Sequence, residues 1–199
     1  MPNVIEAERV LLREVSPAEA QALVKGKRPD MDAWAVGYPV EGTLDASRML
    51  LRQVASQQWR PGFGMYQIIR RRDSTIIGDI GFHSPPDAQG RVVVGFGLAA
   101  SARGQGYATE ALVALTRWAV AQPEVRVVAA DTTHANVASQ AVVTRAGFRH
   151  AGDDQQRRYY EYAADAEAGG HPPRRRPTAR PRRGGESRHR PAWFTRTPR

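Results

Sequence analysis

Two glycines stand directly in front of a helix-like segment between residues 101 and 112, which reads SARGQGYATEAL. Glycine adopts positive φ angles without steric cost, so Gly104 and Gly106 fit an ordinary turn. The first turn of a helix also leaves backbone N–H groups unpaired at the positive end of the helix dipole. Glycines there allow a phosphate group to approach the backbone closely. The segment therefore predicts either a simple turn or a phosphate site.

Two common nucleotide-binding loops do not fit this sequence. A dinucleotide loop needs Gly-x-Gly-x-x-Gly, or Ala at the last position, between a strand and a helix. The run GFGLAA, which begins at Gly95, is followed by more loop, and the run GQGYAT, which begins at Gly104, ends on Thr109. An ATP-binding Walker loop needs Lys and a hydroxyl residue after its glycines, whereas Tyr and Ala follow Gly106. The NAD and ATP interpretations of this loop are therefore rejected.

Hydrophobic patterns predict the elements that position the loop. The expected strands are 9–15, 65–71, 75–83, 91–98, 125–132, 148–150 and 157–162, and the expected helices are 17–25, 44–57, 107–121 and 136–146. The second helix is expected to turn one apolar side towards the core, formed by Leu44, Met49, Leu51 and Val54. Strands and helices in this order imply an α+β (mixed α/β) architecture, with a mixed sheet and helices on its faces.

Composition limits the classes of protein and site. The chain has 199 residues, of which 41% are hydrophobic, enough for one domain with a full core. It has no cysteine, which excludes disulfides, thiolate nucleophiles and zinc–sulfur sites and fits a reducing compartment. The N-terminal residues lack the pattern of a signal peptide, and no apolar stretch reaches the length of a membrane span. We therefore expect a soluble, cytoplasmic protein without a membrane anchor.

The net charge of +9 lies entirely in the C-terminal segment. Residues 171–199 contain ten arginines and one glutamate, whereas the charges of residues 1–170 cancel. We expect a folded domain over 1–165 and a disordered Pro/Arg-rich basic tail over 166–199, because the tail has few aliphatic residues to bury. An arginine-rich tail can bind nucleic acid or the ribosome through phosphate contacts. The alternative is a solvated appendage with no partner.

The run Arg103-Gly104-Gln105-Gly106-Tyr107-Ala108 resembles the acetyl-CoA signature of the GNAT N-acetyltransferases. The segments IIGDIGFH and VGFGL, and the segment AADTTHANVASQAVVTRAGF with its Asn-x-x-Ser, follow in the order of that family. The resemblance covers residues 8–163 and is strongest to the ribosomal-protein alanine/serine N-terminal acetyltransferases. It implies the GNAT fold, a twisted and mostly antiparallel sheet that is splayed at the cofactor site, with helices on both of its faces.

The resemblance also implies how acetyl-CoA binds and explains the two glycines. The pyrophosphate would be held by backbone N–H groups of Gly104, Gln105, Gly106, Tyr107, Ala108 and Thr109, with added charge from Arg103. The pantetheine arm would pair like a strand with Leu98 and Ala99. The N–H group of Leu98 or its neighbour could then polarise the thioester carbonyl, as an oxyanion hole does. Asn136 would bind the pantetheine arm or only cap its helix. No metal is expected.

Catalytic residues are less well marked. Asp131 stands where relatives carry a catalytic Glu and is a candidate general base, or only an acid that binds the amine or holds a loop. Ser139 is a candidate proton donor to the CoA sulfur, or only a hydroxyl bonded to its own helix. His83, on a strand that could face the acceptor, is a further candidate base. His134 and Glu110 are weaker ones.

Two positions depart from the family pattern. Val143 stands where many relatives have a tyrosine general acid, and Val93 stands where many have an acidic residue, so one usual acid and one usual base are missing. Positioning two bound substrates can by itself lower the barrier by roughly 7–11 kcal/mol, so neither loss excludes catalysis. We expect direct acetyl transfer to a primary amine, on a protein N-terminus or a small molecule, by a monomer or homodimer. The alternative is a catalytically weak or inactive acyl-CoA-binding module that the basic tail tethers to the ribosome or to nucleic acid.

Overall fold

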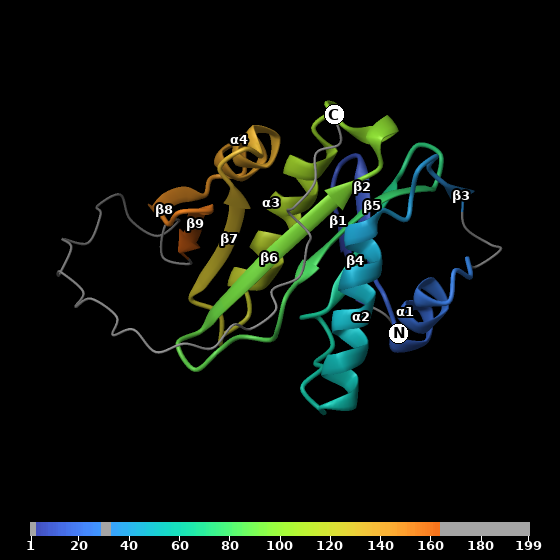
Figure 1. The fold of residues 1–199 in the computed structure, drawn as a ribbon, viewed down its shortest axis with the longest axis horizontal. Helices are drawn as coiled ribbons and strands as arrows, with labels where there is room; N and C mark the ends of the chain where they lie inside the picture. The colour runs from blue at the N-terminus through green and yellow to red at the C-terminus, as the bar shows by residue number, and fades with distance from the viewer. Residues whose placement is uncertain (1–2, 29–32, 164–199) are drawn as a thin grey trace.

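One twisted sheet with helices on both faces makes up the fold in the computed structural model, which describes residues 3–28 and 33–163 (Figure 1). Its strands are β1 (Val4–Glu6), β2 (Val10–Glu14), β3 (Ala33–Trp34), β4 (Met65–Arg70), β5 (Thr75–Phe82), β6 (Arg91–Leu98), β7 (Val127–Thr133), β8 (Arg149–Asp153) and β9 (Arg157–Ala163). Its helices are α1 (Pro17–Val24), α2 (Glu41–Ala55), α3 (Tyr107–Val120) and α4 (Val137–Arg145), with a 3-10 turn, η1 (Ala100–Ala102).

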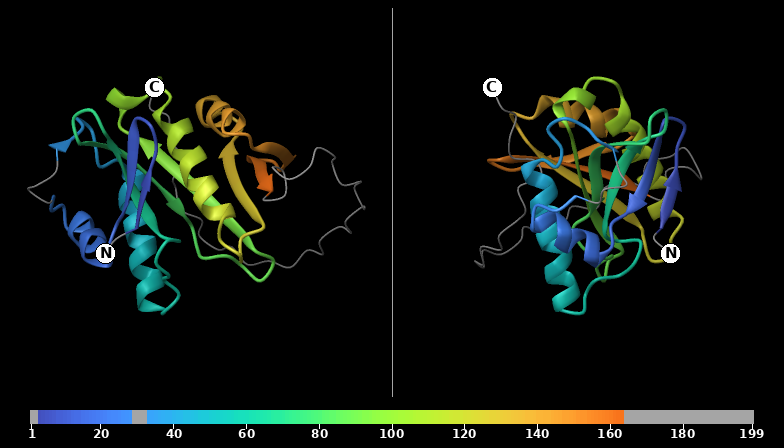
Figure 2. Two further views of the ribbon diagram at one scale, coloured as in Figure 1. Left: turned by 180° about the vertical axis from the view of Figure 1, so that it is seen from behind. Right: turned by 90° about the vertical axis from the view of Figure 1, so that its right-hand side faces the viewer.

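The sheet has the order β1-β2-β4-β5-β6-β7-β9-β8, and β3 lies beside β5. The β3–β5 and β6–β7 pairs are parallel, and the other pairs are antiparallel. This mixed, mostly antiparallel sheet confirms the expected α+β fold class. Two views from opposite sides place α3 on one face and α2 on the other (Figures 1 and 2).

Side chains of β6 point alternately to the α3 side and to the α2 side of the sheet. Val92, Val94 and Phe96 of β6 belong to the hydrophobic core together with Leu112 and Leu115 of α3. A strand turns alternate residues to opposite faces, so Val93, Gly95 and Gly97 of β6 lie on the side of α2. The part of β6 on that side therefore has small side chains, which leaves room for another molecule.

The helix α2 corrects two expectations. It begins at Glu41, three residues earlier than the pattern indicated, and its buried residues are Thr43, Ala46, Ser47, Leu50 and Gln53. The expected apolar side is present only in part: Met49 and Leu51 are partly buried and pack against the core, Leu44 is partly buried, and Val54 is exposed. The helix buries polar residues because each finds a hydrogen-bond partner, and the hydrophobic pattern alone does not register such partners.

Two short strands were not expected from the sequence. β1 was missed because it has only three residues, and β3 because its two residues pair in parallel with Thr75 and Ile76 of the distant strand β5. Within the described residues, no helix is long and apolar enough to cross a membrane. The cytoplasmic location and the boundary near residue 165 stay predictions, and the expected tail lies outside the described residues.

Candidate functional site

The loop between β6 and α3 exposes a run of backbone N–H groups. Gly104 and Gly106 have φ angles of +73° and +82°, and Gly106 is the N-cap of α3. These left-handed conformations favour glycine and turn the chain so that successive N–H groups face the same side. Within the described residues, the N–H groups of residues 104–109 have no hydrogen-bond acceptor. The loop and the first turn of α3 therefore form a cradle for an anion.

Beside this cradle, β6 and β7 separate. Their last parallel pair is Val93 with Ala129, although β6 continues to Leu98. The Ala99 N–H donates to the Ile77 carbonyl at 2.9 Å, so Ala99 faces β5. Since successive residues of a strand turn their N–H and C=O groups to opposite edges, the N–H of Leu98 points into the gap. Leu98, rather than Ala99, is thus in position to pair with an extended ligand.

A cavity of about 190 Å³ occupies the gap. Its walls come from β6, from the glycine loop and from α4, and consist of Phe96, Gly97, Leu98, Arg103, Gly104, Ala108, Asn136, Ala138, Ser139 and Val142. The Nε atom of Arg103 donates to the Leu98 carbonyl at 3.1 Å, which ties the loop to the end of β6. Five of the ten residues that the sequence indicated for acetyl-CoA thus line the cavity: Leu98, Arg103, Gly104, Ala108 and Asn136.

The N-terminal end of α4 forms the wall opposite β6. The Oδ1 atom of Asn136 accepts a hydrogen bond from the Ser139 N–H at 3.0 Å, as an N-cap does. Asn136 therefore fixes the backbone of Ser139, and both residues line the cavity. Val142 also lines it, whereas Val143 is 1% exposed and belongs to the hydrophobic core. The position where relatives carry a tyrosine acid thus does not lie on the cavity wall here.

Asp131 lies on the α2 side of β7 and is 4% exposed. Its carboxylate accepts a hydrogen bond from the guanidinium of Arg157 on β9, and the two groups form an ion pair. No local pattern in the sequence indicates this partner, because the pair joins two strands that are distant in sequence. The ion pair fixes the position of the Asp131 carboxylate at the β7 edge of the gap.

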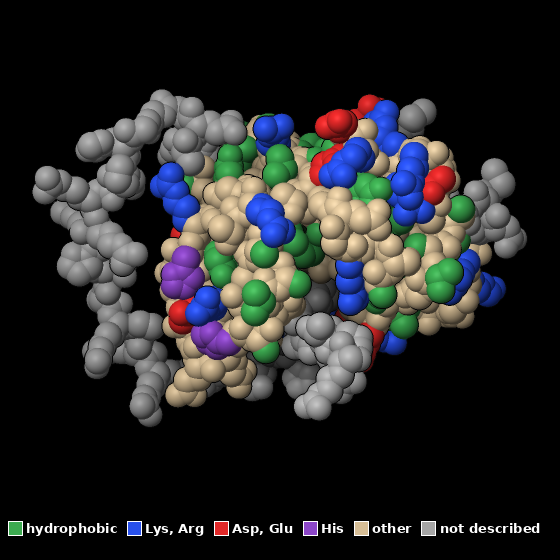
Figure 3. Space-filling view, turned by 90° about the horizontal axis from the view of Figure 1, so that it is seen from above, with side chains coloured by type: hydrophobic (Ala, Val, Ile, Leu, Met, Phe, Trp, Pro, Cys, Tyr) green, Lys and Arg blue, Asp and Glu red, His purple; other side chains and the backbone are tan. Residues whose placement is uncertain are grey.

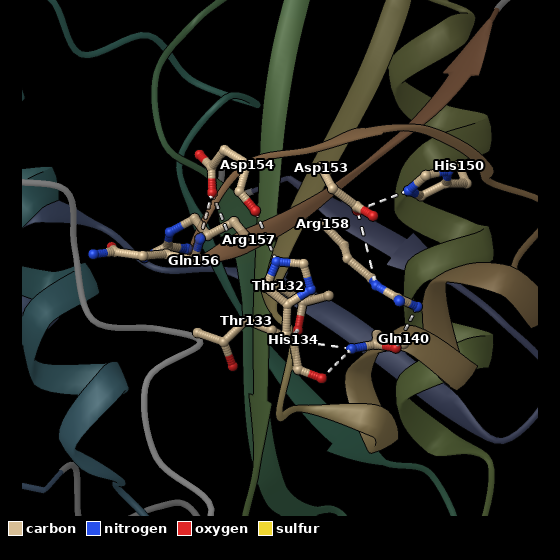
Figure 4. A network of polar contacts seen from close by, with 10 residues as sticks. All are labelled: Thr132, Thr133, His134, Gln140, His150, Asp153, Asp154, Gln156, Arg157 and Arg158. Atoms are coloured by element: carbon tan, nitrogen blue, oxygen red, sulfur yellow. Dashed lines mark hydrogen bonds and ion pairs between the residues drawn. The ribbon is translucent and has the colours of Figure 1, made fainter.

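A polar network joins α4 to the strands β7, β8 and β9 (Figure 4). The N–H of Arg157 donates to the Asp154 carboxylate at 2.7 Å in the turn between β8 and β9. Gln140 of α4 donates to the carbonyls of Thr133 and His134 at 3.1 and 2.9 Å. The carboxamide oxygen of Gln140 accepts from Arg158 at 3.4 Å. The network ties α4, which carries Ser139, to the strand that carries Asp131.

The other candidate bases lie elsewhere. The His83 N–H donates to the Val93 carbonyl at 2.9 Å, so His83 lies five residues from Leu98 along β6, about 16 Å at strand spacing. The Nε2 atom of His134 lies 2.8 Å from the Asp154 carbonyl oxygen. Glu110 forms an ion pair with Arg9 on the α3 side of the loop. Among these catalytic candidates, all within the described residues, only Ser139 lines the cavity. Asp131 lies on β7 beyond Ala129, where the pairing with β6 has ended.

Asp79 on β5 is a buried acid that the sequence reasoning missed. It is 2% exposed and accepts a hydrogen bond from the hydroxyl of Thr43 on α2. Burial raises the pKa of the Asp79 carboxyl to about 7, although the Thr43 hydrogen bond acts in the opposite direction. Asp79 pairs across the sheet with Gly97 of the cavity wall. An acid inside the apolar run IIGDIGF was the signal that could have marked it.

The surface near the cavity is mixed in character. Figure 3 looks onto the end of the molecule that carries α4 and the glycine loop, at the top of Figure 1. Lys and Arg side chains are spread across this face between apolar ones, and His side chains gather on one side of it. This face therefore offers an anion the N–H groups of the loop rather than a dense basic patch.

The sequence is similar to those of known acetyltransferases. The profile of the acetyltransferase (GNAT) domain matches residues 9–149. The uncharacterized N-acetyltransferase YjdG of Bacillus subtilis (strain 168) is 33% identical over 87 residues, which are 44% of this chain and 52% of YjdG. The match spans about half the length of that relative.

Solved structures share the fold. The ribosomal L7/L12 alpha-N-protein acetyltransferase RimL, in complex with coenzyme A, has a TM-score of 0.60 and 20% identity, with 82% of this chain and 99% of that chain covered. An acetyltransferase from Agrobacterium tumefaciens has a TM-score of 0.57 and 24% identity, with 81% and 95% covered. At these identities the similarity shows the fold alone.

Proposed function

The chain belongs to the GNAT acetyltransferase family, and on that premise we propose that it transfers an acetyl group from acetyl-CoA to a primary amine. The observation that carries the proposal is the position of the cavity. It opens where β6 and β7 separate, and it is continuous with a loop whose N–H groups have no acceptor within the described residues. An extended thioester with a pyrophosphate at one end matches both features.

The residues present fit acetyl-CoA. The N–H groups of residues 104–109 would bind the pyrophosphate, and the side chain of Arg103 would add positive charge near the cavity mouth. Pantetheine would lie in the gap and pair with the backbone of Leu98. The Leu98 N–H would then donate to the thioester oxygen, where negative charge develops during attack.

The α2 side of the sheet is the proposed side of approach for the amine. Gly95 and Gly97 leave space there, and Asp131 lies on the same face. The amine nitrogen would attack the thioester carbonyl carbon and lose a proton to Asp131 directly or through water. The C–S bond would break, and the hydroxyl of Ser139 would donate a hydrogen bond to the departing thiolate. Acetyl-CoA, when bound, supplies the activated acyl group and leaves as CoA.

The acceptor is proposed as a primary amine of a protein N-terminus or of a small molecule. RimL, which shares the fold, acts on the N-terminus of a ribosomal protein according to its description. The described face near the cavity has no dense acidic patch that would select a polycation (Figure 3). A panel of N-terminal peptides and small amines, each incubated with acetyl-CoA, would identify the preferred class by the rate of CoA release.

Two glycine variants test binding of the donor. Gly104 and Gly26 have φ angles of +73° and +71°, and a Cβ atom at either position would meet no atom within 4 Å. Both variants therefore carry a similar backbone strain, but only Gly104→Trp places a side chain at the cradle. Calorimetry should show CoA binding to the wild type and to Gly26→Trp and its loss in Gly104→Trp. Failure of the wild type to bind CoA would refute the proposed function.

Turnover separates an enzyme from a binding module. If CoA binds and no amine or peptide in the panel is acetylated, the alternative of an inactive acyl-CoA-binding module replaces the proposed activity. Acetylation of any primary amine above the uncatalysed rate supports the enzyme.

A further inference from the structure

A second layer of contacts holds the glycine loop from the side opposite the cavity. Arg9 precedes β2, and its Nη1 atom donates to the Gln105 carbonyl at 3.0 Å. A Cβ atom at Gly106 would lie 3.2 Å from the Nη2 atom of Arg9. The guanidinium also lies 5.1 Å from the centre of the Tyr107 ring. One arginine, almost a hundred residues away in sequence, thus contacts Gln105 and Tyr107 and lies beside Gly106 between them.

Glu110 holds this arginine in place. Its Oε2 atom accepts from the Arg9 Nε at 2.7 Å, and its Oε1 atom accepts from the backbone N–H groups of Arg9 and Val10 at 2.5 and 3.2 Å. Glu110 lies in the first turn of α3, so its carboxylate is close to the N–H groups proposed to hold the pyrophosphate. A carboxylate at that place repels a bound anion unless a cation offsets it, and Arg9 supplies that cation.

Resting on the proposed function, we infer that Arg9 is a positioning residue for the donor's pyrophosphate, which holds the glycine loop in its binding geometry and offsets the charge of Glu110. Arg9 does not line the cavity, so its effect passes through the loop. A loop that already has its binding geometry loses less conformational entropy when the ligand binds than a mobile loop does. Removal of Arg9 should therefore weaken only those ligands that carry the pyrophosphate.

Two ligands distinguish this role from a general structural one. CoA carries the pyrophosphate, and pantetheine carries only the arm that would lie between β6 and β7. For Arg9→Gln we expect the dissociation constant of CoA, measured by calorimetry, to rise about tenfold, as for the loss of one charge-assisted contact. The dissociation constant of pantetheine, measured by NMR titration, should change less than about twofold.

Arg71→Gln is the matched control. The side chain of Arg71 is 43% exposed, close to the 49% of Arg9, and it also pairs with a glutamate, Glu6. It does not contact the loop, so both dissociation constants should stay at their wild-type values. If Arg9→Gln does not fold, Arg9→Lys replaces it. A single ammonium group cannot reach Glu110 and Gln105 together. We therefore expect the dissociation constant of CoA, but not that of pantetheine, to rise in Arg9→Lys, by less than in Arg9→Gln.

Equal weakening of CoA and pantetheine in the Arg9 variant, or no change in either, would overturn the inference. These outcomes are distinct from failure of the proposed function, in which the wild type itself does not bind CoA.

Discussion

Ser139 shows how a single hydroxyl obtains its proposed role from its surroundings. Its backbone is fixed by Asn136, and its side chain lines the cavity near the gap in the sheet. Serine at the start of a helix often bonds only to local backbone groups, and the sequence could not exclude that alternative. Because Ser139 lines the cavity, its hydroxyl is the candidate hydrogen-bond donor to the departing CoA sulfur.

We expect Ser139→Ala to lower kcat about tenfold, the effect of losing one hydrogen bond to developing charge, or about 1.4 kcal/mol. The KM for acetyl-CoA should stay within about twofold, because the pyrophosphate contacts remain. Thr144→Ala is the control, since the Thr144 hydroxyl lies on the same helix and donates to the Gln140 carbonyl at 2.8 Å. Equal losses in both variants would show that the helix, not the hydroxyl, is responsible.

The Asp131–Arg157 ion pair is expected to affect both the free energy of unfolding and the turnover of the protein. Asp131 is 4% exposed as a residue, and the Arg157 side chain is 16% exposed. Asp131→Asn leaves Arg157 without its counter-charge, so the free energy of unfolding should fall by about 2 kcal/mol. The double variant with Arg157→Met removes that charge and should regain most of the lost stability. Turnover should stay low in both, and its recovery in the double variant would limit Asp131 to a structural role.

At the scale of elements, Thr43 and Asp79 anchor the start of α2 on the sheet. The Thr43 hydroxyl accepts from the Val40 N–H at 3.2 Å and donates to the Asp79 carboxyl. Thr43 and Asp79 are both buried, and Asp79 pairs across the sheet with Gly97. The position of α2, which walls the proposed acceptor side, therefore depends on a carboxyl whose pKa of about 7 leaves both its protonated and its ionised form present at neutral pH.

This burial predicts a pH-dependent stability. The folded pKa of Asp79 is about 7 and its ordinary value is 3.8. The folded state therefore binds the proton more tightly, and the resulting stability is present below pH 4 and is lost as pH rises through 7. Between pH 5 and pH 8 the wild type should lose about 3 kcal/mol relative to Asp79→Asn, by 1.36 kcal/mol per pKa unit.

Urea denaturation of both proteins across that range measures the difference. Asp45→Asn on the same helix is the control, because the Asp45 side chain is 27% exposed and pairs with Arg48 on the surface. It should leave the pH dependence of the wild type unchanged. If the free energies of unfolding of the wild type and Asp79→Asn change in parallel with pH, the raised pKa of Asp79 is contradicted.

Most of the elements were predictable from the sequence, because their signals are local. The glycine loop, the helix α3 after it and the cap at Asn136 each follow from neighbouring residues. The contacts that complete the site are not local. Arg9 with Glu110, Asp131 with Arg157 and Thr43 with Asp79 each join separate elements. A hydrophobic pattern does not indicate contacts between distant residues. The ion pairs and hydrogen bonds around the site could therefore be identified only from the structure.

For the whole molecule, the net charge is concentrated at one end of the chain. The described residues end at 163, and residues 171–199, which lie outside them, hold ten arginines and one glutamate. The rest of the chain is neutral. Donor binding is proposed to depend on the N–H cradle within the described part. Any general affinity for polyanions should therefore belong to the C-terminal segment alone.

Deletion of residues 171–199 tests this division. The full chain should bind single-stranded RNA at low salt, with a slope of log K against log salt no steeper than about −6 for nine net charges. The deleted chain, whose net charge is zero, should lose that binding and keep the calorimetric dissociation constant of CoA and the thermal midpoint. RNA binding that survives the deletion would place a polyanion surface on the neutral part of the chain. Weaker CoA binding after the deletion would show instead that the arginines contribute to the donor site.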